Sequence, residues 1–161
     1  MKTKAESLGM MAEERFLFHS TTQTKVDTMC THNIDNSLYN TRATAFGHGV
    51  YFACHASFSD RHCSEKSGST RLMFLVTVMT GSYTQGDPSM DSPTAMEPNY
   101  GVFDSCVDDI QKPTVFVVFD KEQYYPAYLI EYYSTTASVE GGNTGSLECQ
   151  DAAQVEGCSV M

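Results

Sequence analysis

Two short segments contain the side chains best suited to bind a small polar ligand. In the first, residues 16–21, an apolar run leads to His19 and then to hydroxyl side chains. In the second, residues 47–53, two glycines precede Tyr51 and further apolar residues. An imidazole can hydrogen-bond a hydroxyl or an amide, and a tyrosine ring can stack on a flat group. The pair therefore indicates a pocket for a flat, polar ring.

Both side chains need elements that hold them in place. The first segment is typical of a strand that ends at His19, followed by a turn whose Ser and Thr hydroxyls cap a helix. In the second segment, Gly47 and Gly49 allow the backbone to bend before a strand over residues 50–52. Tyr51 would then stand on a rigid strand beside a tight turn.

The order of these motifs resembles the catalytic domain of the PARP family of ADP-ribosyltransferases. In that family a strand with His-Gly-Thr precedes a Gly-x-Gly-x-Tyr-Phe-Ala motif, and a later strand carries a third site residue. Here the later strand would lie in residues 112–119. The Asp-Ser-Cys-Val-Asp string and the Tyr-Pro-x-Tyr ending are most similar to the mono-ADP-ribosylating subgroup that includes the zinc-finger antiviral protein and the TCDD-inducible PARP. Further matches follow in the family's order in residues 56–59, 73–75, 80–81, 103–108 and 125–132.

The resemblance implies a fold, a substrate and a set of site residues. The fold is the α+β ADP-ribosyltransferase fold, with mostly antiparallel split β-sheets and a few short helices, and the substrate is NAD. His19 would hydrogen-bond a ribose hydroxyl, while the backbone of Ser20 would hold the nicotinamide carboxamide. The Ser59 hydroxyl would bond the same amide, and Tyr51 would stack on the nicotinamide ring. His62 stands where a second stacking tyrosine is expected.

Three positions depart from the family pattern. Val115 stands where polymer-forming members have a catalytic glutamate, so no carboxylate is available there to stabilise positive charge or activate a ribose hydroxyl. Ser20 replaces a glycine and would be strained if the backbone angles there suit only glycine. His62 offers a smaller stacking area than tyrosine.

These departures lead to two alternative functions. The first is an NAD-dependent mono-ADP-ribosyltransferase that acts on protein side chains, binds acceptor proteins and does not form polymer. The second is a catalytically inactive PARP-like binding module in an antiviral or stress response. A third alternative, a hydrolase with Cys54 or Cys63 as nucleophile, has no nucleophile-elbow or helix-start motif to support it.

Composition limits the partners and the compartment. The chain has 161 residues, enough for one domain with a core, and a net charge of -10 that repels phosphate backbones. We expect no direct nucleic-acid binding, because the Lys and Arg residues are scattered. No apolar stretch approaches the roughly 20 residues of a membrane helix, and a hydrophobic signal core is missing. We therefore expect a cytoplasmic protein, with the nucleus as a further compartment.

The six cysteines show no Cys-x-x-Cys pair, which favours reduced thiols. Cys30 with His32, and His62 with Cys63, lack the two-pair spacing of a zinc site, so no metal is expected.

Between the motifs, periodicity predicts the connecting elements. Val26, Met29 and Cys30 would form the apolar face of a helix in residues 24–32. The sequence further predicts a loop in 33–46, a short helix in 56–62, a buried strand in 71–80, an irregular loop in 86–101, and a hairpin of strands 114–119 and 127–133.

Three regions are expected: a lead-in (residues 1–14), a PARP-like domain (15–133) and an acidic tail (134–161). The family's usual strand and helix before the His strand have no counterpart, which predicts a truncated domain or a sheet edge open to a partner. The tail is predicted to be disordered and ends in a C-a-a-X box with Cys158 as the farnesyl site. One prenyl chain anchors weakly, so membrane association would need a second signal, such as palmitoylation of Cys149.

Overall fold

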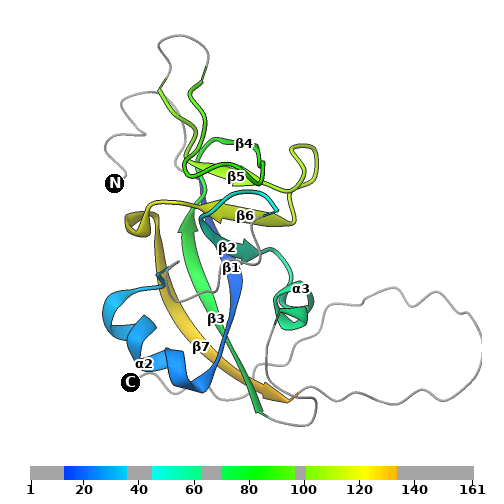
Figure 1. Ribbon diagram of the computed structural model, residues 1–161. Helices are drawn as coiled ribbons and strands as arrows, with labels where there is room; N and C mark the ends of the chain where they lie inside the picture. The colour runs from blue at the N-terminus through cyan, green and yellow to red at the C-terminus, as the bar shows by residue number, and fades with distance from the viewer. Residues whose placement is uncertain (1–12, 36–44, 63–69, 97–100, 134–161) are drawn as a thin grey trace, which may run out of the picture.

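The described part of the chain forms one mixed β-sheet flanked by two short helices (Figure 1). The computed structural model describes residues 13–35, 45–62, 70–96 and 101–133. Within these residues the sheet has seven strands in the order β4-β5-β6-β2-β1-β3-β7. All neighbouring strands are antiparallel except β4 and β5, which are parallel. The elements are β1 (Glu14–Thr21), α2 (Gln23–His32), β2 (Val50–Ala53), α3 (Ala56–Arg61), β3 (Thr70–Met79), β4 (Tyr83–Gln85), β5 (Ser105–Val107), β6 (Val115–Val118), the 3-10 turn η2 (Lys121–Gln123) and β7 (Tyr124–Tyr133).

The sheet is split between its neighbouring strands β1 and β2. β1 pairs with β3 along its whole length, from Glu14 opposite Met79 to Thr21 opposite Leu72. On its other side β1 pairs with β2 at a single position, Phe18 opposite Ala53. Beyond that pair the recorded ladder between β1 and β2 stops, so the main chain of Ser20 on the β2 side takes no part in it.

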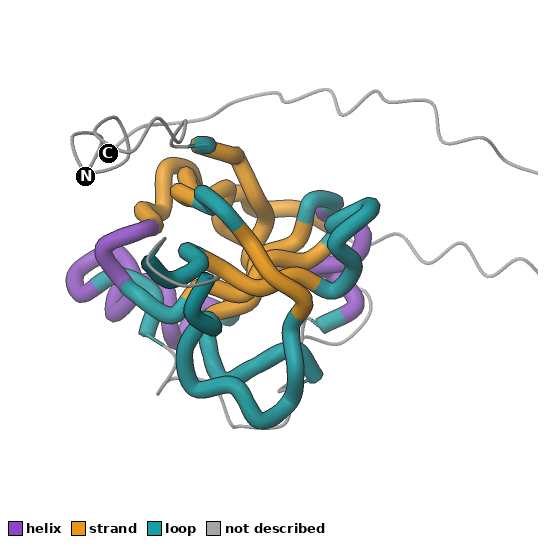
Figure 2. Tube along the Cα trace, turned by 90° about the horizontal axis from the view of Figure 1, so that it is seen from above, coloured by secondary structure: helices purple, strands orange, loops and turns teal. Residues whose placement is uncertain are grey.

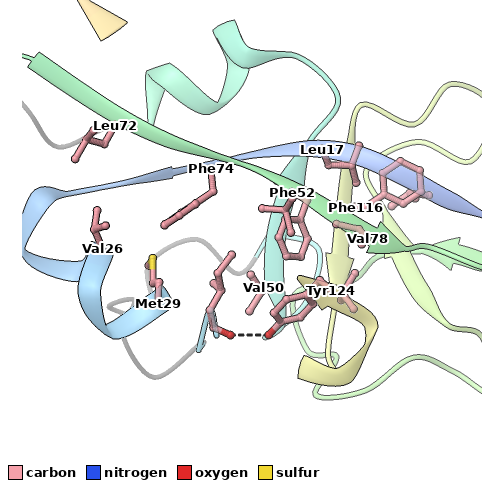
Figure 3. Close-up of a cluster of buried hydrophobic side chains, with 14 residues drawn as sticks. Leu17, Val26, Met29, Val50, Phe52, Leu72, Phe74, Val78, Phe116 and Tyr124 are labelled. Carbon is pink, nitrogen blue, oxygen red and sulfur yellow. Dashed lines mark hydrogen bonds between the residues drawn. The ribbon is translucent and has the colours of Figure 1, made fainter. Parts of the chain in front are cut away.

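One face of the sheet forms the main hydrophobic core with α2 (Figure 3). Val26 and Met29 of the helix are buried, as the apolar spacing predicts. Cys30 is exposed, so its assignment to the apolar face was wrong; the buried face of α2 is limited to Val26 and Met29. The Tyr124 hydroxyl closes the core by donating to the Ile34 carbonyl at 2.8 Å. The core side chains labelled in the figure include Leu17, Val50, Phe52, Leu72, Phe74, Val78 and Phe116.

A second, smaller cluster lies on the opposite face of β2 and β6. Because side chains alternate along a strand, Val115 and Val117 face away from the core that Phe116 and Val118 enter. The helix α3 reaches this second cluster through Phe58. The two helices therefore lie on different sides of the sheet (Figure 2). Also packed there are Tyr51, Phe46, Met90, Cys106 and Phe119.

Most predicted elements are present, with shifts of a residue or two. The helix in 56–62 is α3, the strand in 71–80 is β3, and described residues 86–96 are irregular apart from a bridge between Ala95 and Val102. β4 and β5 were not predicted as strands. His19 lies inside β1 and does not end it. The N-cap of α2 is Thr22, which makes no side-chain cap hydrogen bond, so the predicted capping was wrong.

The predicted hairpin was also wrong. Both strands exist, but β6 pairs with β2 and β5, whereas β7 pairs with β3 at the far side of the sheet. All four residues of β6 are buried, as expected for a strand with neighbours on both sides and packing on both faces. The 3-10 turn η2 then carries the chain across, with Asp120 capping it through the amide of Glu122.

The predictions for residues 1–12, 36–44 and 134–161 lie outside the described residues. β4 and β7 are the edge strands of the sheet that the described residues form. Among those residues, no helix is long and apolar enough to span a bilayer.

Candidate functional site

His19 is fixed at the split of the sheet by a main-chain hydrogen bond. Its side chain is buried, and Nδ1 lies 2.8 Å from the carbonyl oxygen of Tyr51. Because a carbonyl can only accept, Nδ1 carries the proton and donates it. Burial lowers the pKa of His19 to about 4; the bond to Tyr51 opposes this shift and the positive charge of Lys25 adds to it. The ring is therefore neutral near pH 7, and its Nε2 is an acceptor.

Tyr51 holds the turn that precedes it. Its hydroxyl donates to the Gly47 carbonyl at 2.8 Å and accepts from the Phe46 amide at 3.0 Å. Burial raises the pKa of Tyr51 and the hydrogen bond from Phe46 lowers it, so the phenol stays protonated near pH 7. Because both polar functions of the hydroxyl are used, the ring is held in one orientation beside Val115 and Phe58.

The two glycines of the turn are required by close packing. Gly47 has a φ of 123°, and a Cβ there would lie 2.9 Å from the Phe119 ring and 3.2 Å from the Met90 carbonyl oxygen. A Cβ on Gly49 would lie 2.6 Å from the Val118 carbonyl oxygen. The tight turn that the sequence predicted is therefore present.

Ser20 occupies the family's glycine position without backbone strain. Asn33 is the one described non-glycine residue with a positive φ, so Ser20 has ordinary angles inside β1. The alternative in which this replacement distorts the site is wrong. Its main chain lies where β1 and β2 separate, next to the His19–Tyr51 bond.

Helix α3 lies against β1 and β2. Ser59 is buried, and its hydroxyl has no hydrogen-bond partner among the described residues. His62 is exposed at the end of the helix, and its ring centroid lies 5.2 Å from that of Phe58. Phe58 thus joins His62 to the cluster around Tyr51. The sequence analysis missed Phe58, although its four-residue spacing from His62 places the two on one helix face.

Val115 is buried in the cluster that contains Tyr51, and it pairs with Ala53 across β2 and β6. The carboxylate near Val115, that of Asp108, is occupied by hydrogen bonds to the start of β6. Asp108 accepts from the amides of Thr114 and Val115, each at 2.9 Å, and from the Thr114 hydroxyl. Burial raises the pKa of Asp108, but these hydrogen bonds outweigh it and leave the pKa below its usual value. Asp108 therefore anchors the start of β6 as an anion near pH 7.

No described group of three or more His, Cys, Asp or Glu side chains could hold a metal ion. Cys30, Cys54 and Cys106 are free thiols, while Cys63 and Cys158 lie outside the described residues. Burial raises the pKa of Cys54, with Arg15 opposing and Asp108 adding to the shift. A thiol held protonated is a poor nucleophile, which argues against a hydrolase built on Cys54.

A split, mostly antiparallel sheet with a histidine and a tyrosine at the gap defines an ADP-ribosyltransferase fold. Residues 2–97 match the poly(ADP-ribose) polymerase catalytic domain, and the chain belongs to that family.

Several relatives support this assignment. The chain is 40% identical over 129 residues to protein mono-ADP-ribosyltransferase PARP12 of Mus musculus, covering 80% of this chain and 18% of the relative. It is 36% identical over 140 residues to protein mono-ADP-ribosyltransferase PARP11 of the same species, covering 74% of this chain and 42% of the relative. It is 31% identical over 135 residues to protein mono-ADP-ribosyltransferase PARP14 of Homo sapiens, covering 81% of this chain and 8% of the relative. The chain thus spans less than half the length of each.

Proposed function

We propose that this chain is an NAD-dependent mono-ADP-ribosyltransferase that modifies protein side chains and builds no polymer. The observation that carries the proposal is the bond from His19 Nδ1 to the Tyr51 carbonyl, which presents a neutral Nε2 acceptor at the split of the sheet. The printed names of the relatives, which describe them as mono-ADP-ribosyltransferases, support it.

In the proposed reaction the bond between nicotinamide and ribose breaks. Nicotinamide leaves with the bonding electrons, and a nucleophilic side chain of the acceptor protein forms the new bond to the same ribose carbon and loses its proton. The transition state resembles an oxocarbenium ion. The site therefore contributes mainly by binding and orienting NAD, and it needs no nucleophile of its own.

Each site residue has a proposed binding role. His19 Nε2 accepts a hydrogen bond from a ribose hydroxyl, since the low pKa of His19 keeps the ring neutral near pH 7. The main chain of Ser20 and the hydroxyl of Ser59 hold the carboxamide. Tyr51 stacks on the nicotinamide ring, and His62 offers a second, smaller ring surface.

Polymer formation would need a carboxylate to activate a ribose hydroxyl on the growing chain. Val115 provides none, and the neighbouring Asp108 is tied to the backbone of Thr114 and Val115. An apolar, buried residue at this position therefore favours a single transfer per acceptor.

Labelling from biotinylated NAD tests the proposal. We expect wild-type protein to label itself or a partner, with the label running as a single discrete shift. His19→Gln and Tyr51→Ala should abolish labelling, while His32→Ala, at the exposed end of α2, should not. Thermal unfolding of each variant checks that it is folded. Labelling that persists in both site variants would refute the assignment.

The specific alternative is a catalytically inactive NAD-independent binding module, favoured by the exposed His62 in place of a second stacking tyrosine. Calorimetry with a non-hydrolysable NAD analogue separates the two functions. Heat of binding that is lost in Tyr51→Ala supports the enzyme, whereas no heat at millimolar analogue supports the module.

We further propose a lipid anchor and a cytoplasmic, partly membrane-associated location. In a chain that ends at Met161, Cys158 is the fourth residue from the end and has the C-a-a-X spacing for a farnesyl group. Metabolic labelling with an alkynyl farnesyl analogue should mark the wild type and spare Cys158→Ser. Equal labelling of both would exclude this site.

A further inference from the structure

The turn before Tyr51 is held from a second direction by a loop distant in sequence. His48 donates its amide hydrogen to the Met90 carbonyl at 2.8 Å. Its ring Nδ1 lies 2.8 Å from a carboxylate oxygen of Asp91. Two consecutive loop residues therefore contact a single turn residue, one through the main chain and one through a side chain.

The loop is built to keep its shape. Asp87 accepts from the amide of Ser89 at 2.9 Å and from its hydroxyl, and these bonds lower the pKa of Asp87. The Met90 amide donates to the Asp87 carbonyl at 3.1 Å, and the Gly86 amide donates to the Val107 carbonyl of β5 at 2.9 Å. The loop is thus joined to the sheet at one end and to the turn at the other.

Met90 brings the same loop into contact with the ring of the site. Its side chain packs in the cluster that contains Tyr51, and its carbonyl oxygen lies close to Gly47. Gly47 is also the residue whose carbonyl accepts from the Tyr51 hydroxyl. A displacement of the loop would therefore move both the turn that orients Tyr51 and one wall of the cluster around it.

We propose that His48 and Asp91 are positioning residues for Tyr51, and that their contact sets the affinity of the site for the nicotinamide ring. Neither side chain touches the substrate. Together they hold the Met90 loop against the turn, and the turn fixes the ring through its bonds to Phe46 and Gly47. This inference rests on the proposed function, because it assumes that Tyr51 stacks on the substrate.

A double-mutant cycle on NAD turnover tests the pair. The side chain of His48 is 39% exposed and that of Asp91 is 89% exposed. A contact at this exposure is worth about a two- to five-fold change. We expect His48→Ala and Asp91→Ala each to raise KM for NAD by about that factor with kcat unchanged, and the double variant to match either single one. Asp91→Asn, which keeps the acceptor, should restore most of the affinity.

Matched controls are His32→Ala and Asp27→Asn on α2, both exposed and on the other face of the sheet. They should leave KM unchanged. The inference would be overturned if the increases in KM of the two single variants multiplied in the double variant. It would also be overturned if KM were unchanged in both His48→Ala and Asp91→Ala.

A second readout does not depend on NAD. Hydrogen exchange at the Phe46 amide, which bonds to the Tyr51 hydroxyl, should quicken in His48→Ala and Asp91→Ala but not in the controls. Wild-type protein that neither binds nor turns over NAD refutes the proposed function and the effect on affinity, and this exchange measurement then decides whether His48 and Asp91 position Tyr51. Unchanged exchange in both variants overturns it.

Discussion

Removal of the Tyr51 hydroxyl separates its hydrogen bonds to the turn from the stacking role proposed for its ring. Tyr51→Phe keeps the ring that would stack on nicotinamide. It deletes the bond donated to Gly47 at 2.8 Å and the bond accepted from Phe46 at 3.0 Å. The substitution should therefore loosen the turn while the stacking surface remains.

The cost can be worked out from those two bonds. A neutral hydrogen bond contributes about 1 kcal/mol net, and a donor left without a partner adds to the loss where it is shielded from water. Phe46 is half-buried, so its amide regains part of its bonding from solvent. We expect a loss of about 1–2 kcal/mol in the free energy of unfolding. For a chain of 161 residues, that lowers the melting temperature by about 2–8 °C.

The control is Tyr125→Phe on the edge strand β7. Tyr125 is 71% exposed and its hydroxyl has no hydrogen bond within the described residues, so the melting temperature of this variant should not change. Binding of the NAD analogue should weaken in Tyr51→Phe and vanish in Tyr51→Ala. Identical melting temperatures for Tyr51→Phe and Tyr125→Phe would show that the hydroxyl does not hold the turn, and the reasoning about this site would fail.

Three further outcomes are expected. The pKa of His19 is about 4 in the folded protein and 6.5 in the unfolded chain, so the unfolded chain binds more protons between pH 4 and 6.5. The free energy of unfolding of the wild type should therefore fall by up to about 3 kcal/mol as the pH is lowered through that range. In His19→Gln this contribution to the pH dependence should be absent. If the free energy of unfolding changed with pH in the same way in both proteins, measured by chemical denaturation, the prediction would be contradicted. Asp108→Asn should destabilise by about 1–3 kcal/mol in chemical denaturation at pH 7, since a charged acceptor of several bonds is replaced by a weaker one; a loss no larger than that of exposed Asp109→Asn would count against the anchor. Gly49→Ala should cost about 1–3 kcal/mol in thermal unfolding because its Cβ would lie 2.6 Å from a carbonyl oxygen, and an unchanged melting temperature would mean that the turn can widen.

The sequence predicted the positions of the strands better than it predicted which strands pair with each other. Residues 71–80 and 114–119 are apolar runs whose composition indicates burial, and β3 and β6 lie there. Nothing in such a run specifies its partners, which is why β6 and β7 were taken for a hairpin. Their separation depends on η2 and on distant contacts, such as the Gln123 side chain donating to the Met79 carbonyl at 3.3 Å.

The candidate site likewise contains residues that sequence motifs indicated and contacts that the sequence could not reveal. His19 and Tyr51 belong to motifs with fixed spacing, and the structure joins them through the bond from His19 Nδ1 to the Tyr51 carbonyl, while Ser59 is buried on α3. Their proposed roles await the experiments above. Met90 lies in a Pro-rich loop with no motif, and its contact with the turn at residues 46–49 depends on packing across more than 40 positions of sequence. Periodicity carries no information about such long-range contacts.

The single pair that joins β1 to β2 has a consequence for how the site tolerates change. Ser20 follows the position where this pairing stops, and the binding role proposed for it uses only its peptide N–H and C=O groups, which every residue except proline supplies in full. Substitution at this position alters bulk but does not delete a donor or an acceptor. The exchange of glycine for serine illustrates this tolerance, since the strand geometry is ordinary. Under the proposed roles, the position that would hold the carboxamide therefore tolerates substitution, whereas the side-chain positions His19 and Tyr51 do not.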